Sequence, residues 1–406
     1  MRRLCLAIFL LVSCFLPLHA GSILPDNVEL SAQLDLFATK ASTPKYFLQD
    51  YKEAATKFGI SFGYNLTYNF RFNFLPYVQT FYDINSADRT QTKARIWQGY
   101  FEYLLNDFTF TLGRFTFEDE TLAPFVYYGA DLVKDLALPT ALDGIKHSFS
   151  NAYFAYTILA AKEAEIDEIT KAKLVGAKIE ADPLSWLAVS GFYFYQYKKY
   201  SAGTRNVKDD LSIYGGGIDL FFSDTSGLKF TFAQNGGNRE TERLGIITDN
   251  NHKGHAINGE LYFEKRYKKG ALKSKMGLYS FSTSNDFVAF ANKLNTGIIY
   301  GGMNYNNTFL SSPEIIYADF NFAPYKYPSL FIGAGVFIYA SQKAVLNNRT
   351  YYANEFDLRL GADFDTWGVK LTGGLFNGEA VFFGNPSTEG QKIKKVQLNF
   401  FYKLDI

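Results

Sequence analysis

The chain has 406 residues and is rich in aromatic side chains, with 40 Phe, 29 Tyr and 3 Trp against only 11 Pro. Because Phe and Tyr favour strands and no strong helical periodicity competes with them, the composition indicates a β-rich protein of either two or three soluble domains or one large β structure. The 41 basic and 40 acidic side chains nearly cancel, which excludes the basic excess that attracts nucleic acid.

Residues 1–20 have the layout of a secretory signal peptide, in which a basic pair precedes an apolar run and Ala20 is a small residue at the cleavage site. The four residues that end at Cys14 also resemble a lipobox, the mark of a lipoprotein signal, but the apolar run before that cysteine is short. Cleavage after Ala20 removes Cys14 and the other cysteine, Cys5. The rest of the chain then has no disulfide, thiol nucleophile or thiolate metal site.

No later stretch is long and apolar enough for a transmembrane helix. The longest clean apolar run, 152–161, fits a strand and is too short to span a membrane as a helix. A membrane role therefore requires strands.

Polar and apolar residues alternate in segments of about ten residues, the pattern of a strand with two different faces. In Glu-Phe-Asp-Leu-Arg-Leu, which begins at Glu355, the alternation is unbroken. The pattern predicts eighteen strands, at 28–37, 58–67, 70–82, 94–105, 108–116, 142–149, 152–160, 172–181, 186–198, 211–222, 228–235, 255–266, 271–283, 315–323, 329–340, 353–364, 367–377 and 393–405. The short hairpin at 142–160 and the long connection 284–314 leave sixteen strands as an alternative.

The connections between these strands alternate between short and long. The short ones carry turn residues, as at Asn106-Asp107 and Asp182-Pro183. The long ones are 38–57, 83–93, 117–141, 161–171, 199–210, 237–253, 284–314, 341–352 and 378–391. An outer-membrane barrel has short periplasmic turns, long external loops and an even number of strands. We therefore predict that 21–406 forms a single all-β domain, a transmembrane antiparallel β-barrel in the outer membrane of a Gram-negative bacterium.

The extent of the apolar faces distinguishes this fold from a soluble one. A secreted or periplasmic β-sandwich would bury such faces against each other within about 100–150 residues, whereas here the pattern continues without a linker. The final strand alternates up to the last residue, as the insertion signals of barrels do, although it ends in Ile406 rather than in Phe or Trp.

The polar faces carry so many charges that water must lie beside them, and a barrel of this width leaves an aqueous lumen. The charged residues in the polar phase are Arg71, Glu102, Asp219, Glu260, Glu264, Arg266, Lys273, Lys275, Asp319, Asp357, Arg359, Asp363, Lys370 and Lys403. We predict that they line the pore, although any few of them could instead pair across strands. Because bases and acids are nearly balanced, we make no prediction of charge selectivity.

The third long connection, 117–141, departs from the alternation and is the best candidate for folding into the lumen. It carries three consecutive acids: Glu118, Asp119 and Glu120. We expect them to oppose inward-facing bases and to create a transverse field at a constriction. Arg114 is a further candidate, but Gly113 can introduce a bulge that makes its facing ambiguous. The alternative is a solvated external loop.

Around this loop the sequence resembles a known family. Leu-Gly-Arg at 112–114 closes a strand, and Pro-Thr-Ala-Leu-Asp-Gly at 139–144 ends the loop. This is similar to the G-R-Q turn and the P-x-x-F-D-G-like stretch that bracket the third loop of the Opr-type porins and the related alginate-export barrels. Phe115 stands where Gln is usual, and Leu142 where an aromatic residue is usual. The strand 96–105 resembles the family's Q-A-Y-x-Y-like strand, and the aromatic-rich style resembles major porins of Campylobacter and Helicobacter relatives.

The resemblance implies a passive diffusion channel for ions and small polar solutes. A substrate-specific exporter or uptake channel of the alginate-export type is one alternative, and an adhesin that acts through its external loops is another. The implied partners are outer-membrane lipid, small polar solutes or ions and, because some members are trimers, further copies of the chain in a homotrimer.

No pattern of residues supports an enzyme. A hydrolase needs a nucleophile, a base and an orienting group in register, and His147, His252 and His255 have no suitable neighbours in the sequence. The last two are three residues apart, which is a weak metal signal without further ligands. The acidic stretches 118–120 and 163–168 lack EF-hand spacing, so we expect no cofactor except, at most, a structural Ca²⁺.

Overall fold

The computed structural model describes residues 27–42, 51–83, 91–129, 140–164, 172–202, 205–243, 246–282, 313–327, 329–341, 351–378 and 391–405. The expected signal peptide, 1–20, lies outside these ranges, as does part of each long connection. None of the described residues forms an apolar helix long enough to cross a membrane.

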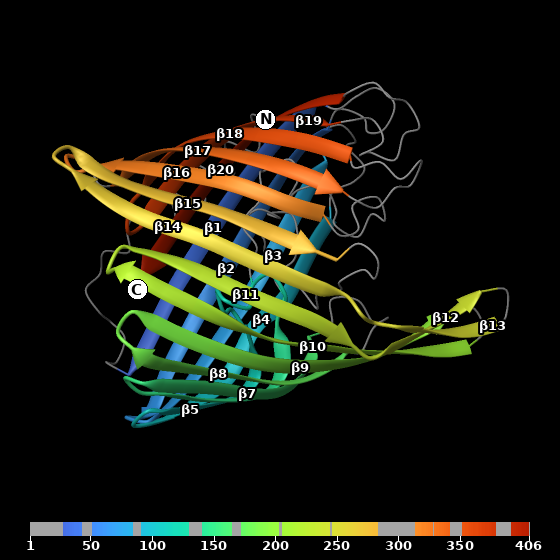
Figure 1. Ribbon diagram of the computed structural model, residues 1–406. Helices are drawn as coiled ribbons and strands as arrows, with labels where there is room; N and C mark the ends of the chain where they lie inside the picture. Colours follow the sequence, from blue (N-terminus) through green and yellow to red (C-terminus); the bar gives the residue numbers. More distant parts are fainter. Residues whose placement is uncertain are drawn as a thin grey trace.

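The described chain is built from β-strands (Figure 1). They are β1 (Val28–Ser42), β2 (Tyr51–Thr67), β3 (Phe70–Asp83), β4 (Gln91–Leu105), β5 (Phe108–Phe115), β6 (Leu142–Ser150), β7 (Phe154–Glu163), β8 (Lys173–Leu184), β9 (Leu187–Ala202), β10 (Arg205–Ser223), β11 (Ser226–Gly236), β12 (Asn238–Arg243), β13 (Ile246–Asn251), β14 (His255–Tyr267), β15 (Gly270–Phe281), β16 (Pro313–Pro324), β17 (Leu330–Ser341), β18 (Tyr351–Asp363), β19 (Trp367–Gly378) and β20 (Gln391–Asp405).

These strands close into one antiparallel barrel. Neighbours in sequence pair around the wall, and β1 pairs with β20 to complete the ring (Figure 1). The ring passes directly from β11 to β14, because β12 and β13 form a hairpin that projects beyond the wall. The closed barrel therefore has eighteen strands, which confirms the predicted fold class and strand number.

The strands are longer than the sequence pattern predicts, chiefly at the end of the barrel that carries the long connections. The predicted loop 199–210 is almost wholly strand in β9 and β10, and 237–253 forms the β12–β13 hairpin. These tips are mostly polar and have no regular apolar face, so alternation could not reveal them. At the opposite end, which we call the turn end, the predicted turn 182–183 lies inside β8. The pairing with β9 is irregular there, after Ala181, because Pro183 has no N–H to donate.

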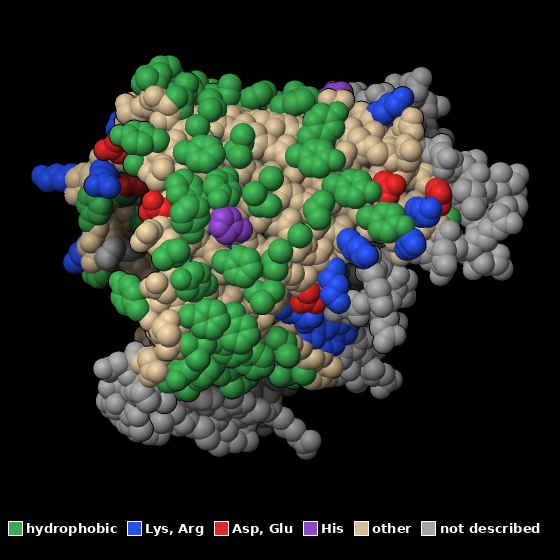
Figure 2. Space-filling model, turned by 90° about the horizontal axis from the view of Figure 1, so that it is seen from below, with side chains coloured by type: hydrophobic (Ala, Val, Ile, Leu, Met, Phe, Trp, Pro, Cys, Tyr) green, Lys and Arg blue, Asp and Glu red, His purple; other side chains and the backbone are tan. Residues whose placement is uncertain are grey.

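Side chains alternate between the lumen and the outer surface. On β18, Glu355 and Asp357 are 1 % and 3 % exposed, whereas Phe356 and Leu358 are 43 % and 52 % exposed. The outside is thus the apolar face, the reverse of a soluble barrel. Figure 2, seen from the side of β5, β7 and β8, shows apolar side chains across the middle of the wall and charged ones mainly toward its two ends.

The segment that follows β5, residues 116–129, lies against the inside of the wall; we call it the inner segment. Leu122 and Phe125 within it are fully buried. The ring of Phe125 stacks on that of inward-facing Phe192 of β9, at a centroid distance of 6.2 Å. Residues 130–139, the rest of the loop expected to fold inward, lie outside the described residues.

Candidate functional site in the barrel lumen

One group of ions lies on the lumenal side of β14, β15 and β16. The Glu260 carboxylate accepts hydrogen bonds from Lys275 Nζ (3.1 Å) and from the Tyr317 hydroxyl (2.6 Å). The Glu260 side chain is 14 % exposed and that of Lys275 is 53 % exposed. The carboxylate is therefore neutralised by its partners, while part of the lysine faces the lumen.

A second ion pair joins Arg359 of β18 to Asp319 of β16, although β17 runs between them. Both terminal nitrogens of Arg359 donate to the Asp319 carboxylate. The residue of β17 at the crossing is Gly333, which is in register with Arg359. A Cβ at Gly333 would lie 3.0 Å from Arg359 Nε and closer still to the Asn321 side chain. The missing side chain thus provides the space in which the pair forms.

Toward the turn end the charges are more open to the lumen. Glu264 accepts a hydrogen bond from Arg266 Nε (3.2 Å) and lies 3.6 Å from Lys273 Nζ. The side chains of Arg266 and Lys273 are 72 % and 70 % exposed. On β18, Asp363 is also exposed. This end of the lumen therefore presents accessible charge of both signs.

The other predicted charges of this arc differ in accessibility. Asp357 is buried, Lys370 is half-buried and Lys403 is exposed. All three face the lumen: Lys370 lies next to outward-facing Leu371, and Lys403 lies on the same face of β20 as buried Gln397.

A buried lysine anchors the inner segment to the wall. Lys178 of β8 is 4 % exposed, and its Nζ lies 2.6 Å from Asp119 of the inner segment and 2.7 Å from Glu180. The Asp119 carboxylate also accepts the Leu122 N–H (3.1 Å), which fixes the turn of the segment. An acid of the loop thus opposes a base of the wall, the arrangement expected at a constriction.

The neighbouring acids extend this contact. Glu120 lies 3.6 Å from Lys229 of β11, but its side chain is 89 % exposed, so the pair is weak. Lys229 is in register with Asp219 of β10. Glu118 accepts a hydrogen bond from the Tyr127 hydroxyl (3.2 Å) within the inner segment.

The end of the inner segment is held by a buried polar network. The Tyr128 hydroxyl donates to Glu163 (2.8 Å), and Gln196 Nε2 donates to the same carboxylate (2.8 Å) and to the Tyr128 oxygen (3.2 Å). Burial, reinforced by the Glu163 carboxylate, raises the pKa of the Tyr128 phenol well above its usual range. The phenol therefore stays protonated and keeps its role as a donor.

On the far side of the lumen, Arg71 of β3 pairs with Glu29 of β1 at 2.5 Å. Glu102 of β4 is in register with Arg71 and is half-buried. The predicted lumenal charges thus spread around the ring rather than gathering in one cluster.

The structure does not place Arg114 in the pore lining, where the sequence analysis expected it. Its Nε and Nη2 donate to Asp143 of β6 at 2.6 and 2.8 Å, and Nη1 donates to the Ile96 carbonyl (3.0 Å). The flanking Phe115 faces inward and is buried, whereas Leu112 is 48 % exposed on the outer surface. Arg114 is in register with Asp143, which lies on the same face of β6 as outward-facing Ile145, 43 % exposed, so this ion pair lies outside the lumen.

Sequence reasoning missed several lumenal residues. Lys178 and Lys229 occupy the polar phase of predicted strands, so the alternation carried a signal for both. Glu163 and Gln196 carried none, because only the fold brings them to Tyr128.

The histidines occupy separate places. His147 lies on β6 between the rings of Phe108 and Tyr156, at centroid distances of 5.8 and 5.6 Å. His252 lies 2.8 Å from Asp209 at the base of the β12–β13 hairpin. Among the residues that the structure describes, no group of three or more His, Cys, Asp or Glu side chains is placed to hold a metal ion.

No protein-family model and no curated protein sequence matches the chain. Solved structures match over almost its whole length. OccK5 (OpdH) and OpdQ of Pseudomonas aeruginosa both superpose with a TM-score of 0.62, at 11 % and 14 % identity, and cover 94 % of this chain and 99 % and 100 % of their own. OccAB4 of Acinetobacter baumannii has a TM-score of 0.63 at 10 % identity and covers 94 % of this chain and 98 % of its own. The chain shares the fold of these barrels.

This likeness agrees with the Opr-type resemblance of the sequence around the third loop. It gives no support to the resemblance to alginate-export barrels or to the porins of Campylobacter and Helicobacter relatives.

Proposed function

We propose that the chain is an outer-membrane porin through which ions and small polar solutes diffuse passively. The observation that carries this proposal is the accessible charge inside the barrel, where the side chains of Arg266 and Lys273 are 72 % and 70 % exposed. A closed barrel of this strand number is wide enough to hold water. The shared fold of the Occ/Opd porins supports the same function.

The outer surface supports a place in the outer-membrane bilayer. Outward side chains such as Leu358 and Ile338 are large, apolar and about half exposed, and lipid is the solvent that stabilises such a surface. All backbone groups of a closed barrel are paired within the wall, as a hydrocarbon environment requires.

The inner segment supports a constriction that acts through its charge. Asp119 and Glu120 project from it toward Lys178 and Lys229 of the wall. Acids and bases opposed across a narrow passage create a transverse field that orients dipolar solutes.

Three further expectations remain proposals. A homotrimer would place part of the apolar wall against other copies of the chain rather than against lipid. An exporter or uptake channel of the alginate-export type would select one solute, and an adhesin would act through its external loops without conducting.

Conductance separates these functions. Purified protein in a planar bilayer is expected to give stable open channels, with currents that scale with the salt concentration, and loaded liposomes are expected to swell in small neutral solutes. A barrel that gives no current steps in the bilayer would contradict the porin function and favour an adhesin. Cross-linking in membranes, followed by electrophoresis without boiling, tests the trimer.

A further inference from the structure

The turns at the turn end of the barrel differ in charge. The turn between β14 and β15 carries Lys268 and Lys269, and the turn between β16 and β17 carries Lys326; all three residues are exposed. The other turns of this end contain no lysine or arginine; they are 68–69, 106–107, 151–153, 185–186, 224–225 and 364–366. The bases of the turns therefore gather over β14–β17.

The two basic turns form one surface. The Tyr325 N–H donates to the Lys269 carbonyl (3.0 Å), which joins the turns, and Figure 1 shows them side by side at the end of the barrel. Lys326 Nζ lies 5.3 Å from the centroid of the exposed Tyr327 ring. Within the described part of the chain, none of the three turn lysines has an acidic partner, so their positive charge is not neutralised.

Lys265 of β14 extends this surface onto the outer face of the wall. Leu261, four residues earlier on the strand, is 38 % exposed on the outer face, and alternation puts Lys265 on the same face. Its neighbour in register on β15 is the apolar Leu272. Lys265 Nζ lies 5.4 Å from the centroid of the Tyr267 ring and forms no ion pair with the described residues. The four lysines of this surface, here called the basic rim, are Lys265, Lys268, Lys269 and Lys326.

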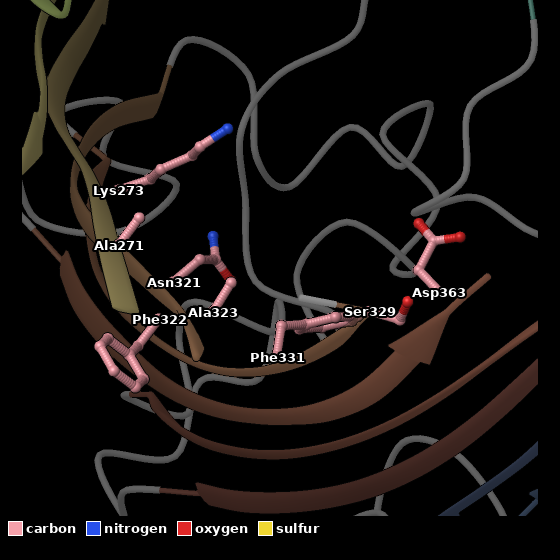
Figure 3. A pocket seen from close by; sticks show the side chains of 8 residues that line it. All are labelled: Ala271, Lys273, Asn321, Phe322, Ala323, Ser329, Phe331 and Asp363. Atoms are coloured by element: carbon pink, nitrogen blue, oxygen red, sulfur yellow. The ribbon is translucent and has the colours of Figure 1, made fainter. Parts of the chain in front are cut away.

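Apolar side chains continue the outer face beyond the basic rim. Leu261 of β14 and Leu330 of β17 are both exposed there. Figure 3, drawn around a cavity on the lumenal side, shows the Phe322 ring of β16 pointing away from Lys273 and Asn321, which face the lumen. Phe322 therefore belongs to the outer face as well. The basic rim thus borders an apolar surface, and a ligand that contacts both must itself have a charged and an apolar part.

Acids lie on both sides of the basic rim. The Glu264 N–H donates to the Thr225 carbonyl (2.8 Å), which brings the β10–β11 turn, with exposed Asp224, beside β14. On the other side, the β18–β19 turn carries exposed Asp365. An anionic ligand is therefore attracted between these turns and repelled at them, which confines it to the outer face of β14–β17.

The charge and polarity of this region fit a phospholipid with a net negative charge. In an outer-membrane barrel the short turns face the periplasm, so the basic rim lies at the level of the headgroups of the inner leaflet. Lysines near headgroups attract anionic lipids, and tyrosines favour the same level. A peptidoglycan strand or an acidic protein would contact the turns alone and would gain nothing from the outward Lys265 or from the apolar wall beyond it.

We propose that the outer face of β14–β17 binds an anionic glycerophospholipid of the inner leaflet of the outer membrane. The ammonium groups of the basic rim contact its headgroup, with Lys265 extending along the wall to reach the phosphate. The acyl chains lie along Leu261 and Phe322, and Tyr267 packs where headgroup and chains meet. The proposal rests on the outer-membrane place of the proposed porin and goes beyond it, because it names a lipid that the barrel selects.

Native mass spectrometry of the purified protein in detergent tests the site, with phosphatidylglycerol and phosphatidylethanolamine of identical chains as probes. Phosphatidylglycerol is expected to bind at an about fivefold lower lipid concentration, since one lysine near anionic lipid contributes on the order of this factor. Inorganic phosphate at the same concentration as the lipid is expected not to displace it, because phosphate has no chains to contact the wall. Equal binding of the two lipids, or displacement by inorganic phosphate, would overturn the site.

Paired variants locate the site. Lys265→Gln with Lys268→Gln is expected to remove the preference for phosphatidylglycerol. The matched control, Lys392→Gln with Lys394→Gln, removes the same charge from exposed positions of β20 at the opposite end of the barrel and is expected to keep the preference. Electrophoresis without boiling confirms that each variant is a folded barrel. An equal loss of preference in the two pairs would mean attraction by net charge alone and would overturn the site.

Conductance separates a failure of this site from a failure of the porin function. Lys265 lies on the outer face and Lys268 in a turn, so their paired variant is expected to conduct like the original protein in planar bilayers. A conducting channel without lipid preference would overturn the lipid site and leave the porin function supported. A folded barrel that prefers phosphatidylglycerol but does not conduct would support the lipid site and contradict the porin function.

Discussion

Arg359 binds Asp319 across an intervening strand because Gly333, the residue at the crossing, has no side chain. The two ions are 15 % and 10 % exposed, so each depends on the other for its stability in the wall. The absence of a side chain at Gly333 is therefore a condition for this ion pair.

Gly333→Val is expected to separate this pair and to lower the free energy of unfolding by about 1–3 kcal/mol, the usual cost of overpacking. Urea titration of the barrel refolded in lipid vesicles measures this loss. The matched control is Gly373→Val on β19, where an added Cβ meets no atom within 4 Å. Equal losses from the two variants would show that the space over Gly333 has no special role.

The two faces of β18 give an asymmetric prediction. Leu358→Arg is expected to lower the free energy of unfolding by about 2–4 kcal/mol if the residue lies near the middle of the bilayer. Asp357→Asn, its lumenal neighbour, is expected to leave the barrel folded and to change the ratio of cation to anion currents. The first effect is measured by urea titration and the second by the reversal potential in a salt gradient. The reverse pattern would mean that the faces are assigned inside out.

The facing of most strands could be predicted from sequence, because lipid outside and water inside impose a period of two on every wall residue. Glu355 and Phe356 illustrate this, since their exposures of 1 % and 43 % follow the alternation. Arg114 could not be assigned, because Gly113 before it has φ of +129° and the facing beyond such a residue depends on the backbone.

The inner segment shows what the sequence could and could not reveal. Its acids were visible, but the partner of Asp119 is Lys178, 59 residues away. No sequence motif links these two residues. This pairing depends on the closure of the barrel, which brings β8 opposite the inner segment. A local sequence pattern therefore cannot predict it.

Lys178→Met is expected to loosen the inner segment from the wall. Removal of the buried amine leaves the Asp119 and Glu180 carboxylates without their base, so the lumen becomes more negative and the cation preference rises. Single-channel recordings are expected to show greater current noise, and the reversal potential is expected to shift toward that of a cation-selective pore. Lys229→Met is the control, because its partner Glu120 is 89 % exposed and the pair contributes little. Identical recordings from both variants would contradict the anchoring role of Lys178.

The outward position of Arg114 leads to a prediction that distinguishes it from every lumenal charge. Arg114→Leu leaves the Asp143 carboxylate, 24 % exposed, without its bidentate partner on an apolar surface. The expected loss is about 1–3 kcal/mol in the free energy of unfolding, less than for a fully buried pair. The double variant with Asp143→Leu is expected to recover most of this loss, because two leucines suit lipid better than one unpaired acid. Single-channel conductance and ion selectivity are expected to stay at their original values in both variants, since neither side chain faces the pore. If Arg114→Leu changed the ion selectivity and left the stability intact, Arg114 would face the lumen and the outward assignment would be wrong.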